Sequence, residues 1–167
     1  AERKVPKPTK DNASKAIDKI YRLIRSSSFQ LAYGGDGSGG TFAYLTQGSM
    51  QRVVDFCKAA NMLHQETVFC DIGHGLGNVS LHVACSGVKY TFGVEVDVAR
   101  CKLAIELYRR FLSKEDNFTV PNHRCGLICA DITKLPPPQF VSFYFMFDLA
   151  FSRSLMYEIL EWLNHSK

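Results

Sequence analysis

Apolar residues along this chain follow two patterns, and each pattern predicts a different kind of element. In the first, apolar side chains recur every three or four positions between polar ones, which is typical of amphipathic helices. In the second, short apolar runs are bounded by glycine, proline or acidic residues, which is typical of buried strands. Helices are expected at 12–25, 48–60, 78–85, 98–112 and 154–164, and strands at 68–71, 90–95, 126–130 and 140–147.

Strands and helices alternate from residue 68 onward, and this order predicts the fold class. Parallel strands need crossover connections, and right-handed crossovers place them in an open, doubly wound sheet. We therefore predict an α/β fold with a Rossmann-like sheet, of which four strands are visible, and a helical N-terminal extension. Residues 1–40 are expected to form a basic arm, a helix and a glycine-rich connector or lid, and residues 41–167 the domain that contains the sheet.

Two further expectations concern the ends of this pattern. The serines at 26–28 are expected to end the first helix. The run 140–147 is apolar throughout, so this strand is expected to be buried on both faces of the sheet.

A glycine-rich turn follows the first strand. Its glycines, Gly73, Gly75 and Gly77, are spaced G-x-G-x-G, whereas a dinucleotide-binding turn has G-x-G-x-x-G. Asp71 precedes the turn, where a carboxylate would repel a pyrophosphate but would suit the ammonium of a methionine-like group. The turn opens a helix whose free N–H groups attract negative charge. Glu95 ends the next strand and is placed to accept hydrogen bonds from a ribose diol.

Acidic side chains close all four predicted strands: they are Asp71, Glu95, Asp131 and Asp148. Ligands of doubly wound sheets bind beyond the carboxyl ends of the strands, so four acids at this edge predict a site there. Asp131 would accept a hydrogen bond from an adenine amino group, and Ile132 would pack on the ring. A cap of the following turn is the alternative for Asp131.

These motifs resemble motif I of the class I S-adenosylmethionine-dependent methyltransferases. The combination of residues 68–84 with Gly93-Val94-Glu95 further resembles the non-SET Rossmann-fold histone lysine methyltransferases, known for disrupting telomeric silencing. Tyr44-Leu45-Thr46 falls where that family has a Tyr-Gly-x-Thr loop over the cofactor, and the segment 147–151 falls where it has Asn-Asn-Phe-Ala-Phe. The resemblance covers about residues 41–151.

The resemblance implies S-adenosylmethionine as cofactor, with S-adenosylhomocysteine as product. No metal site is expected, because the five histidines are scattered without the spacing of metal ligands. The cofactor-binding residues that it implies are Tyr44, Thr46, Asp71, Gly73, His74, Gly75, Gly77, Glu95, Asp131, Ile132 and Phe147. It implies catalytic roles for Asp148, Phe151 and Tyr44, with the aromatic side chains as walls of a channel for the target lysine. Ordinary core packing is the alternative for the aromatics, and a helix or turn cap is the alternative for Asp148.

The chain departs from the family pattern at several positions. Ile72 and His74 replace leucine and serine in the turn, and no glycine follows Tyr44. Phe147 and Asp148 replace both asparagines. The chain also ends after the fourth strand and one helix, which indicates either a shortened lineage or a piece of a larger protein.

The distribution of charge bears on nucleic-acid binding, and the spacing of the cysteines bears on the cellular compartment. Of the net charge of +4, residues 1–25 carry eight basic and three acidic side chains, or +5, and the remainder carries −1. Such an arm could follow the phosphates of nucleosomal DNA, or it could be a solvated helix face. The six cysteines form no C-x-x-C pair, which favours reduced core cysteines in an intracellular protein. No apolar run reaches the length of a membrane span.

The family resemblance implies a nuclear enzyme that methylates a histone lysine on the nucleosome. Two other functions stay open. A nucleic-acid methyltransferase would carry Asn/Asp-Pro-Pro-aromatic after the fourth strand, and residues 148–151 keep both ends of that motif but neither proline. The second function that stays open is a non-catalytic S-adenosylmethionine-binding module. The spacing of the glycines and Asp71 disfavour a dehydrogenase.

Overall fold

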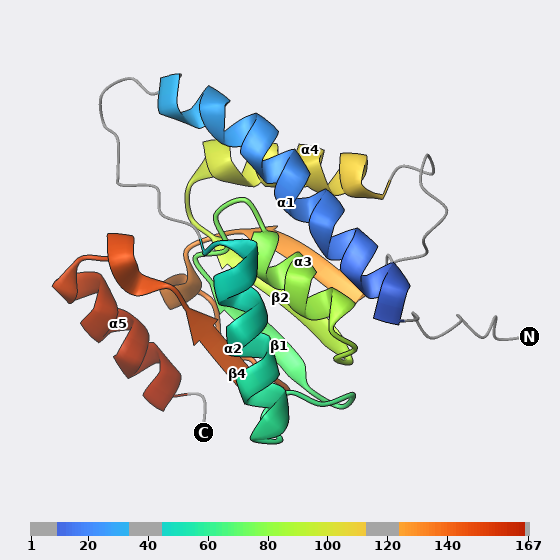
Figure 1. Cartoon of the computed structure of the whole chain (residues 1–167). Helices are drawn as coiled ribbons and strands as arrows, with labels where there is room; N and C mark the ends of the chain where they lie inside the picture. The colour runs from blue at the N-terminus through green and yellow to red at the C-terminus, as the bar shows by residue number, and fades with distance from the viewer. Residues whose placement is uncertain (1–9, 34–44, 113–123, 166–167) are drawn as a thin grey trace, which may run out of the picture.

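The computed structural model describes residues 10–33, 45–112 and 124–165, and its centre is a four-stranded parallel sheet (Figure 1). The strands are β1 (Val68–Ile72), β2 (Tyr90–Glu95), β3 (Cys125–Cys129) and β4 (Phe143–Met146). Their order across the sheet is β3-β2-β1-β4, so β1 and β2 occupy its middle. Helices lie on both faces, and the predicted Rossmann-like α/β fold is confirmed.

The register of the strands aligns their carboxyl ends. Ile72 of β1 pairs with Val94 of β2 and with Met146 of β4, and Glu95 pairs with Cys129 of β3. The residues that follow each strand therefore emerge at one edge of the sheet. This is the edge at which a doubly wound sheet binds its ligands.

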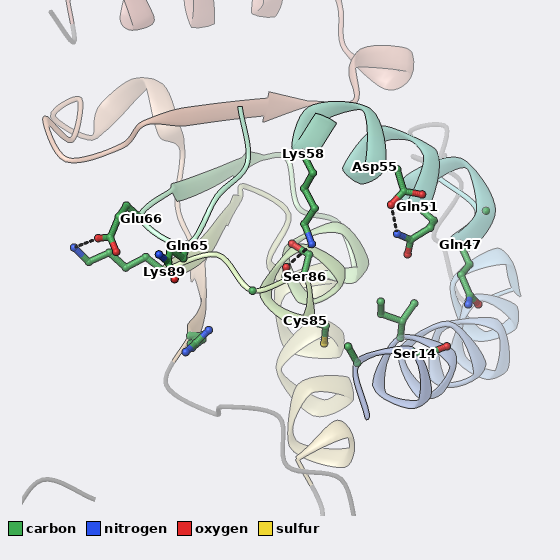
Figure 2. A pocket seen from close by; sticks show the side chains of 15 residues that line it. Ser14, Gln47, Gln51, Asp55, Lys58, Gln65, Glu66, Cys85, Ser86 and Lys89 are labelled. Carbon is green, nitrogen blue, oxygen red and sulfur yellow. Dashed lines mark hydrogen bonds and ion pairs between the residues drawn. The ribbon is translucent and has the colours of Figure 1, made fainter. Parts of the chain in front are cut away.

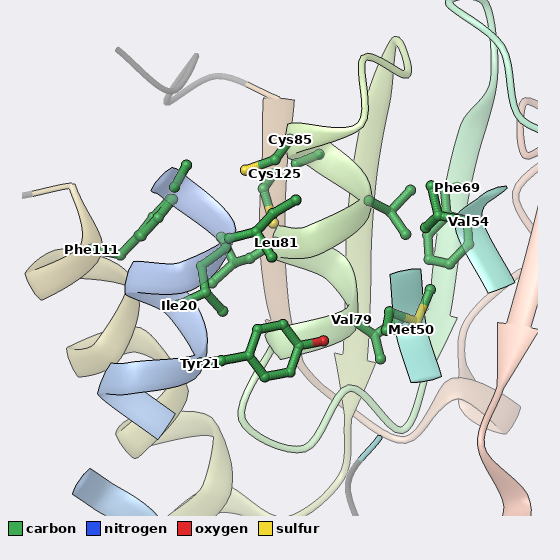
Figure 3. Packing of buried hydrophobic residues seen from close by; sticks show 14 of the residues in the cluster. Ile20, Tyr21, Met50, Val54, Phe69, Val79, Leu81, Cys85, Phe111 and Cys125 are labelled. Atoms are coloured by element: carbon green, nitrogen blue, oxygen red, sulfur yellow. The ribbon is translucent and has the colours of Figure 1, made fainter. Parts of the chain in front are cut away.

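One face of the sheet carries most of the helices. Helix α3 (Asn78–Cys85) lies directly on the sheet and is buried along its whole length. Helices α1 (Lys10–Tyr33), α2 (Gln47–Ala59) and α4 (Val98–Phe111) pack around it. Figure 3 shows the apolar cluster between these elements. Its largest fully buried side chains include Ile20, Tyr21, Met50 and Phe69.

The opposite face is covered by the last helix, α5 (Arg153–Asn164). Ile159 and Trp162 of α5 pack on Ile72 and Val94 from the two central strands. The Trp162 Nε1–H donates a hydrogen bond to the Leu135 carbonyl oxygen over 2.7 Å, and the indole meets the Tyr144 ring edge-on. This anchors α5 beside the segment that connects β3 with β4. Within the described ranges, no helix combines the length and the apolar character that a membrane crossing requires.

Two sequence-based expectations about element boundaries were wrong. The first helix does not end at Ser26-Ser27-Ser28 but continues to Tyr33. The Ser26 hydroxyl donates to the Leu23 carbonyl oxygen within the helix, and serine lowers helix stability too little to stop it. The last strand is also shorter than 140–147 and only half buried, since β4 lies at the edge of the described sheet and Phe140 before it is exposed.

A chain of hydrogen bonds that runs from the core to the surface ties α1, α2 and α3 together. His82 of α3 is fully buried, its Nδ1 lies 3.2 Å from the Tyr21 hydroxyl, and its Nε2 lies 3.0 Å from Gln51 Oε1. Gln51 donates in turn to Asp55 over 2.9 Å. Burial lowers the pKa of His82 from 6.5 to about 4, so the ring is neutral in the folded protein at pH 7.

Replacing His82 with glutamine should reduce the acid sensitivity of the fold. An unfolded chain protonates this histidine near pH 6.5, whereas the folded chain resists protonation until about pH 4. The stability that the neutral ring contributes is therefore present above pH 6.5 and is lost as the pH falls towards 4. Between pH 7 and pH 5, the loss of unfolding free energy should be smaller in the variant by roughly 2 kcal/mol. Urea unfolding of both proteins at the two pH values measures it, and equal losses would contradict this role.

Candidate active site at the carboxyl edge of the sheet

The glycine-rich turn after β1 forms the centre of the candidate site. Gly73 has φ +74°, and its N–H donates to the Val94 carbonyl oxygen over 2.8 Å, which holds the turn against β2. A Cβ atom at Gly73 would lie 2.6 Å from Cζ of Phe151. The Phe151 ring therefore lies directly on the turn, and only glycine permits this approach.

Helix α3 begins at the end of this turn with its first N–H groups uncapped by a side chain. Gly77, in the left-handed conformation, is the residue before the helix. Free N–H groups at a helix start favour a negatively charged partner. The structure thus brings Gly73, the start of α3 and Phe151 together at this edge of the sheet.

The Asp71 side chain lies beneath the glycine-rich turn and is not exposed at the carboxyl edge of the sheet. It is buried and accepts a hydrogen bond from the Ser80 hydroxyl of α3 over 2.8 Å. Burial raises the pKa of Asp71 to about 7, hydrogen bonds from Ser80 oppose the rise, and the charge of Glu95 adds to it. The contact with a cofactor ammonium stays a prediction. Ser80 was missed by the sequence reasoning, and a polar residue within an apolar helix is the signal that could have revealed it.

His74 also points inward from the turn. Its side chain is buried. A Cβ atom added at Gly93 would lie 2.5 Å from the His74 Cβ, so β2 requires glycine at position 93. Nδ1 lies 2.9 Å from the Gly75 carbonyl oxygen, and Nε2 makes no hydrogen bond within the described residues. Burial lowers the pKa of His74, although Glu95 and nearby carbonyl groups oppose this. The ring therefore supports the turn from below, and its contact with a cofactor stays a prediction.

Glu95 connects the turn to the start of α4. Its side chain is 4% exposed, and its two carboxylate oxygens each accept one backbone hydrogen bond, from Gly75 over 3.0 Å and from Asp97 over 2.9 Å. Arg100 approaches one of these oxygens at 3.8 Å. A carboxylate has about four acceptor positions, so Glu95 keeps capacity for ribose hydroxyls while it orders the turn.

Asp131 and Ile132 follow β3 at the same edge. The Asp131 carboxylate caps the short 3-10 helix Ile132–Lys134, accepting from the Thr133 N–H and hydroxyl, and the Thr133 hydroxyl is the main cause of its lowered pKa. The turn-capping alternative therefore describes this residue in the structure, while the adenine contact stays a prediction. Ile132 is buried with Ile72 and Val94 in the core next to α5.

The segment after β4 runs beside the glycine turn, because Met146 pairs with Ile72 immediately before it. Phe147 is half buried, and Asp148 is exposed in the 3-10 helix Asp148–Ala150. In the described part of the chain the Asp148 side chain has no hydrogen-bond partner. Ser152, not Asp148, caps α5 by accepting from the Leu155 N–H. The capping alternative for α5 is thus wrong, and the catalytic role stays a prediction.

The predicted cofactor loop is only partly described. Thr46 caps α2 by accepting from the Ser49 N–H over 3.2 Å, and its own contact with a cofactor stays a prediction. Asn78 at the start of α3 donates to the Leu45 carbonyl oxygen over 3.4 Å, which brings this segment to the glycine turn. Asn78 was another residue that the sequence reasoning missed. Tyr44, the arm 1–9 and the glycine-rich segment 34–40 lie outside the described residues.

A large groove lies at the opposite ends of the strands (Figure 2). It has a volume of about 1250 Å³ and is lined by Lys58 and Gln51 of α2, by Glu66 before β1 and by Lys89 before β2. Lys58 donates to the Ser86 carbonyl oxygen, and Lys89 pairs with Glu66. None of the predicted site residues that the structure describes lines this groove. No set of three or more His, Cys, Asp or Glu side chains within 10–33, 45–112 and 124–165 is placed to hold a metal ion.

The family model for the histone methylation protein DOT1 matches residues 26–165. No curated protein matches the sequence significantly.

Solved methyltransferase structures share the fold. Magnesium protoporphyrin IX methyltransferase from Synechocystis PCC 6803, with bound S-adenosylhomocysteine, is 15% identical with a TM-score of 0.54, and 89% of this chain covers 66% of that one. The same enzyme with bound S-adenosylmethionine gives 14% identity, a TM-score of 0.55 and coverage of 89% and 70%. A putative RNA methyltransferase from Pyrococcus horikoshii is 18% identical, with a TM-score of 0.53 and coverage of 83% and 66%. The chain thus spans about two thirds of the length of these proteins.

Proposed function

The chain belongs to the histone methylation protein DOT1 family, and from this premise we propose that it is an S-adenosylmethionine-dependent methyltransferase whose acceptor is a histone lysine on the nucleosome. The observation that carries the proposal is the meeting of Gly73, Glu95 and Phe151 at one edge of the sheet. Two of the solved structures with this fold contain the same cofactor or its product.

The residues at this edge are suited to the cofactor. Glu95 would accept hydrogen bonds from the ribose hydroxyls, and the N–H groups at the start of α3 would receive the carboxylate of the methionine part. Gly73 allows a close approach of the backbone. The cofactor supplies an electrophilic methyl group on a positively charged sulfur. The protein residues contribute position and electrostatics, because in-line transfer needs no covalent enzyme intermediate.

The acceptor lysine must lose its proton before it can attack. Its free pKa is ~10.4, and burial in an apolar channel lowers the pKa of an amine. Phe151 lies on the glycine turn, and Phe147 is half buried at the end of β4. Both would form walls of such a channel. Asp148 is the exposed acid beside them and would stabilise the positive charge that develops on the lysine nitrogen.

Transfer of a labelled methyl group tests this function. The protein is incubated with labelled S-adenosylmethionine and, separately, with nucleosomes, free histones, RNA and DNA. Label on a core-histone lysine, greater with nucleosomes than with free histones, is expected. Label on RNA or DNA alone would support the nucleic-acid alternative, and cofactor binding without transfer to any of the four would support the binding module.

The N-terminal arm should contribute to nucleosome binding in the nucleus, where a histone methyltransferase would act. Deleting residues 1–9 removes Arg3, Lys4 and Lys7 and leaves α1, which begins at Lys10. If the arm follows DNA phosphates, nucleosome affinity should fall, and the slope of log affinity against log salt should flatten by about 2–3. Cofactor affinity should not change. Binding measured at several salt concentrations tests this, and an unaltered slope would leave the arm a solvated tail.

A further inference from the structure

Two cysteines meet beside the candidate ribose-binding glutamate. Cys101 lies in the first turns of α4, and Cys129 ends β3 in register with Glu95. The Cys101 thiol donates to the Glu95 carbonyl oxygen over 3.3 Å. Cys129 is the residue paired with Glu95 across the sheet, and it is close enough to Cys101 to raise the pKa of that thiol. The same Glu95 carbonyl accepts the Ala130 N–H over 2.9 Å. Both sulfur atoms therefore lie at the point where β2, β3 and α4 join.

The two thiols differ in accessibility. Cys129 is exposed, whereas Cys101 is buried behind it. The other four cysteines are all buried. Among them, Cys85 and Cys125 are electrostatic neighbours in the core, so they provide a pair that is close together but out of reach of solvent.

We propose that Cys129 and Cys101 are a modification site, at which hydrogen peroxide converts the two thiols into a disulfide at the edge of the cofactor site. In the first step the Cys129 thiolate attacks one peroxide oxygen and the O–O bond breaks. A sulfenic acid forms, and the leaving hydroxide takes up the proton that the Cys129 thiol released, giving water. In the second step the Cys101 sulfur attacks the sulfenic sulfur, the S–O bond breaks, and the thiol proton leaves with hydroxide as water. The two thiols lose two electrons, and the peroxide is reduced to two molecules of water.

The environment of the pair assigns the order of these steps. Burial raises the pKa of Cys101 to about 12, and its contact with Cys129 adds to the rise. Cys101 therefore stays a thiol in the reduced protein and does not react with peroxide directly. Cys129 is the residue that peroxide reaches first. Cys101 then reacts because it is held next to the sulfenic acid.

A disulfide here would change the surroundings of Glu95. The two sulfurs would close to about 2.05 Å, and the hydrogen bond from Cys101 to the Glu95 carbonyl would be lost. The Asp97 side chain caps α4 by accepting from the Arg100 N–H, and the Asp97 N–H donates to Glu95 Oε1. A shift of the start of α4 would therefore also move the Glu95 carboxylate. This consequence rests on the proposed function. Oxidation should then weaken S-adenosylhomocysteine binding roughly tenfold, and thiol reduction should restore it.

Non-reducing peptide mass spectrometry tests the pair without any cofactor. The full chain is treated with hydrogen peroxide, and free thiols are then alkylated. A linked peptide of Cys101 and Cys129 is expected, it should disappear on reduction, and Cys85 and Cys125 should stay unlinked. Cys129→Ser and Cys101→Ser should each abolish the link, whereas Cys57→Ser, a control in α2, should not. Cys129 oxidised to a sulfinic acid without a link, or a link equally frequent at Cys85 and Cys125, would overturn the proposal.

Calorimetry with S-adenosylhomocysteine on reduced and oxidised protein separates this inference from the proposed function. Weaker binding to the oxidised form, with Cys129→Ser protected from the change, supports the coupling between the pair and the site. Equal binding to both forms overturns that coupling. A disulfide that forms in a protein that binds the compound in neither form would contradict the proposed function and leave the cysteine pair established.

Discussion

Replacing Asp148 with alanine should reduce the rate of methyl transfer by about 2–4 kcal/mol in activation free energy, which is roughly 30- to 1000-fold. Positive charge develops on the lysine nitrogen as the methyl group arrives, and the exposed carboxylate beside the glycine turn can stabilise it. The same carboxylate raises the pKa of the lysine, which opposes deprotonation. We expect stabilisation of the transition state to outweigh this cost. Cofactor affinity should change little.

The structure separates this effect from a loss of stability. The Asp148 side chain is exposed and caps neither α5, which Ser152 caps, nor the short 3-10 helix that Asp148 begins. Asp148→Ala should therefore leave the midpoint of thermal unfolding nearly unchanged. Asp148→Asn should keep much of the activity if positioning is more important than charge. Glu158→Ala, an exposed acid on α5, is the matched control and should keep the parent rate. A normal rate per folded molecule of Asp148→Ala would end the catalytic assignment.

The second large effect is expected at Glu95. Glu95→Ala should weaken S-adenosylhomocysteine binding by roughly 1–3 kcal/mol, because hydrogen bonds to a charged acceptor are lost. The alanine variant also leaves the N–H groups of Gly75 and Asp97 without their acceptor, so the fold should lose stability as well. Glu95→Gln keeps one oxygen acceptor and should fall between the two proteins in both respects.

Binding and stability must be measured on the same Glu95 samples. Calorimetry gives the affinity, and thermal unfolding shows that the protein is folded at the temperature of the titration. Glu66→Ala is the matched control. Glu66 is an acid like Glu95, but it is exposed and lies before β1, at the opposite edge of the sheet. Unchanged affinity in folded Glu95→Ala would remove Glu95 from the cofactor site.

The centre of the fold was predictable because its sequence signals are local and strong. The apolar runs of β1 and β2, the glycines between β1 and α3, and the acid at the end of β2 place these elements within one residue of the structure. The alternation of strands and helices along the chain then predicted a parallel sheet. The same residues carry the family resemblance, and the family match confirms it.

The direction of individual side chains was not predictable from the same pattern. Asp71 and His74 flank Ile72-Gly73 within the most recognisable motif, yet both side chains point beneath the turn, where Asp71 meets Ser80 and His74 meets Gly93. Their direction depends on α3 and β2, which are distant in sequence. The exposure of β4 likewise follows from its place at the edge of the described sheet rather than from its apolar composition.

The central claim is that the carboxyl edge of this sheet binds S-adenosylmethionine and not a dinucleotide. The most direct test is titration calorimetry of the folded chain with S-adenosylhomocysteine and, separately, with NAD. One molecule of S-adenosylhomocysteine should bind per chain, and NAD should give no measurable heat, because the glycine spacing and Asp71 disfavour a pyrophosphate at this turn. Tight binding of NAD together with no binding of S-adenosylhomocysteine would contradict the account.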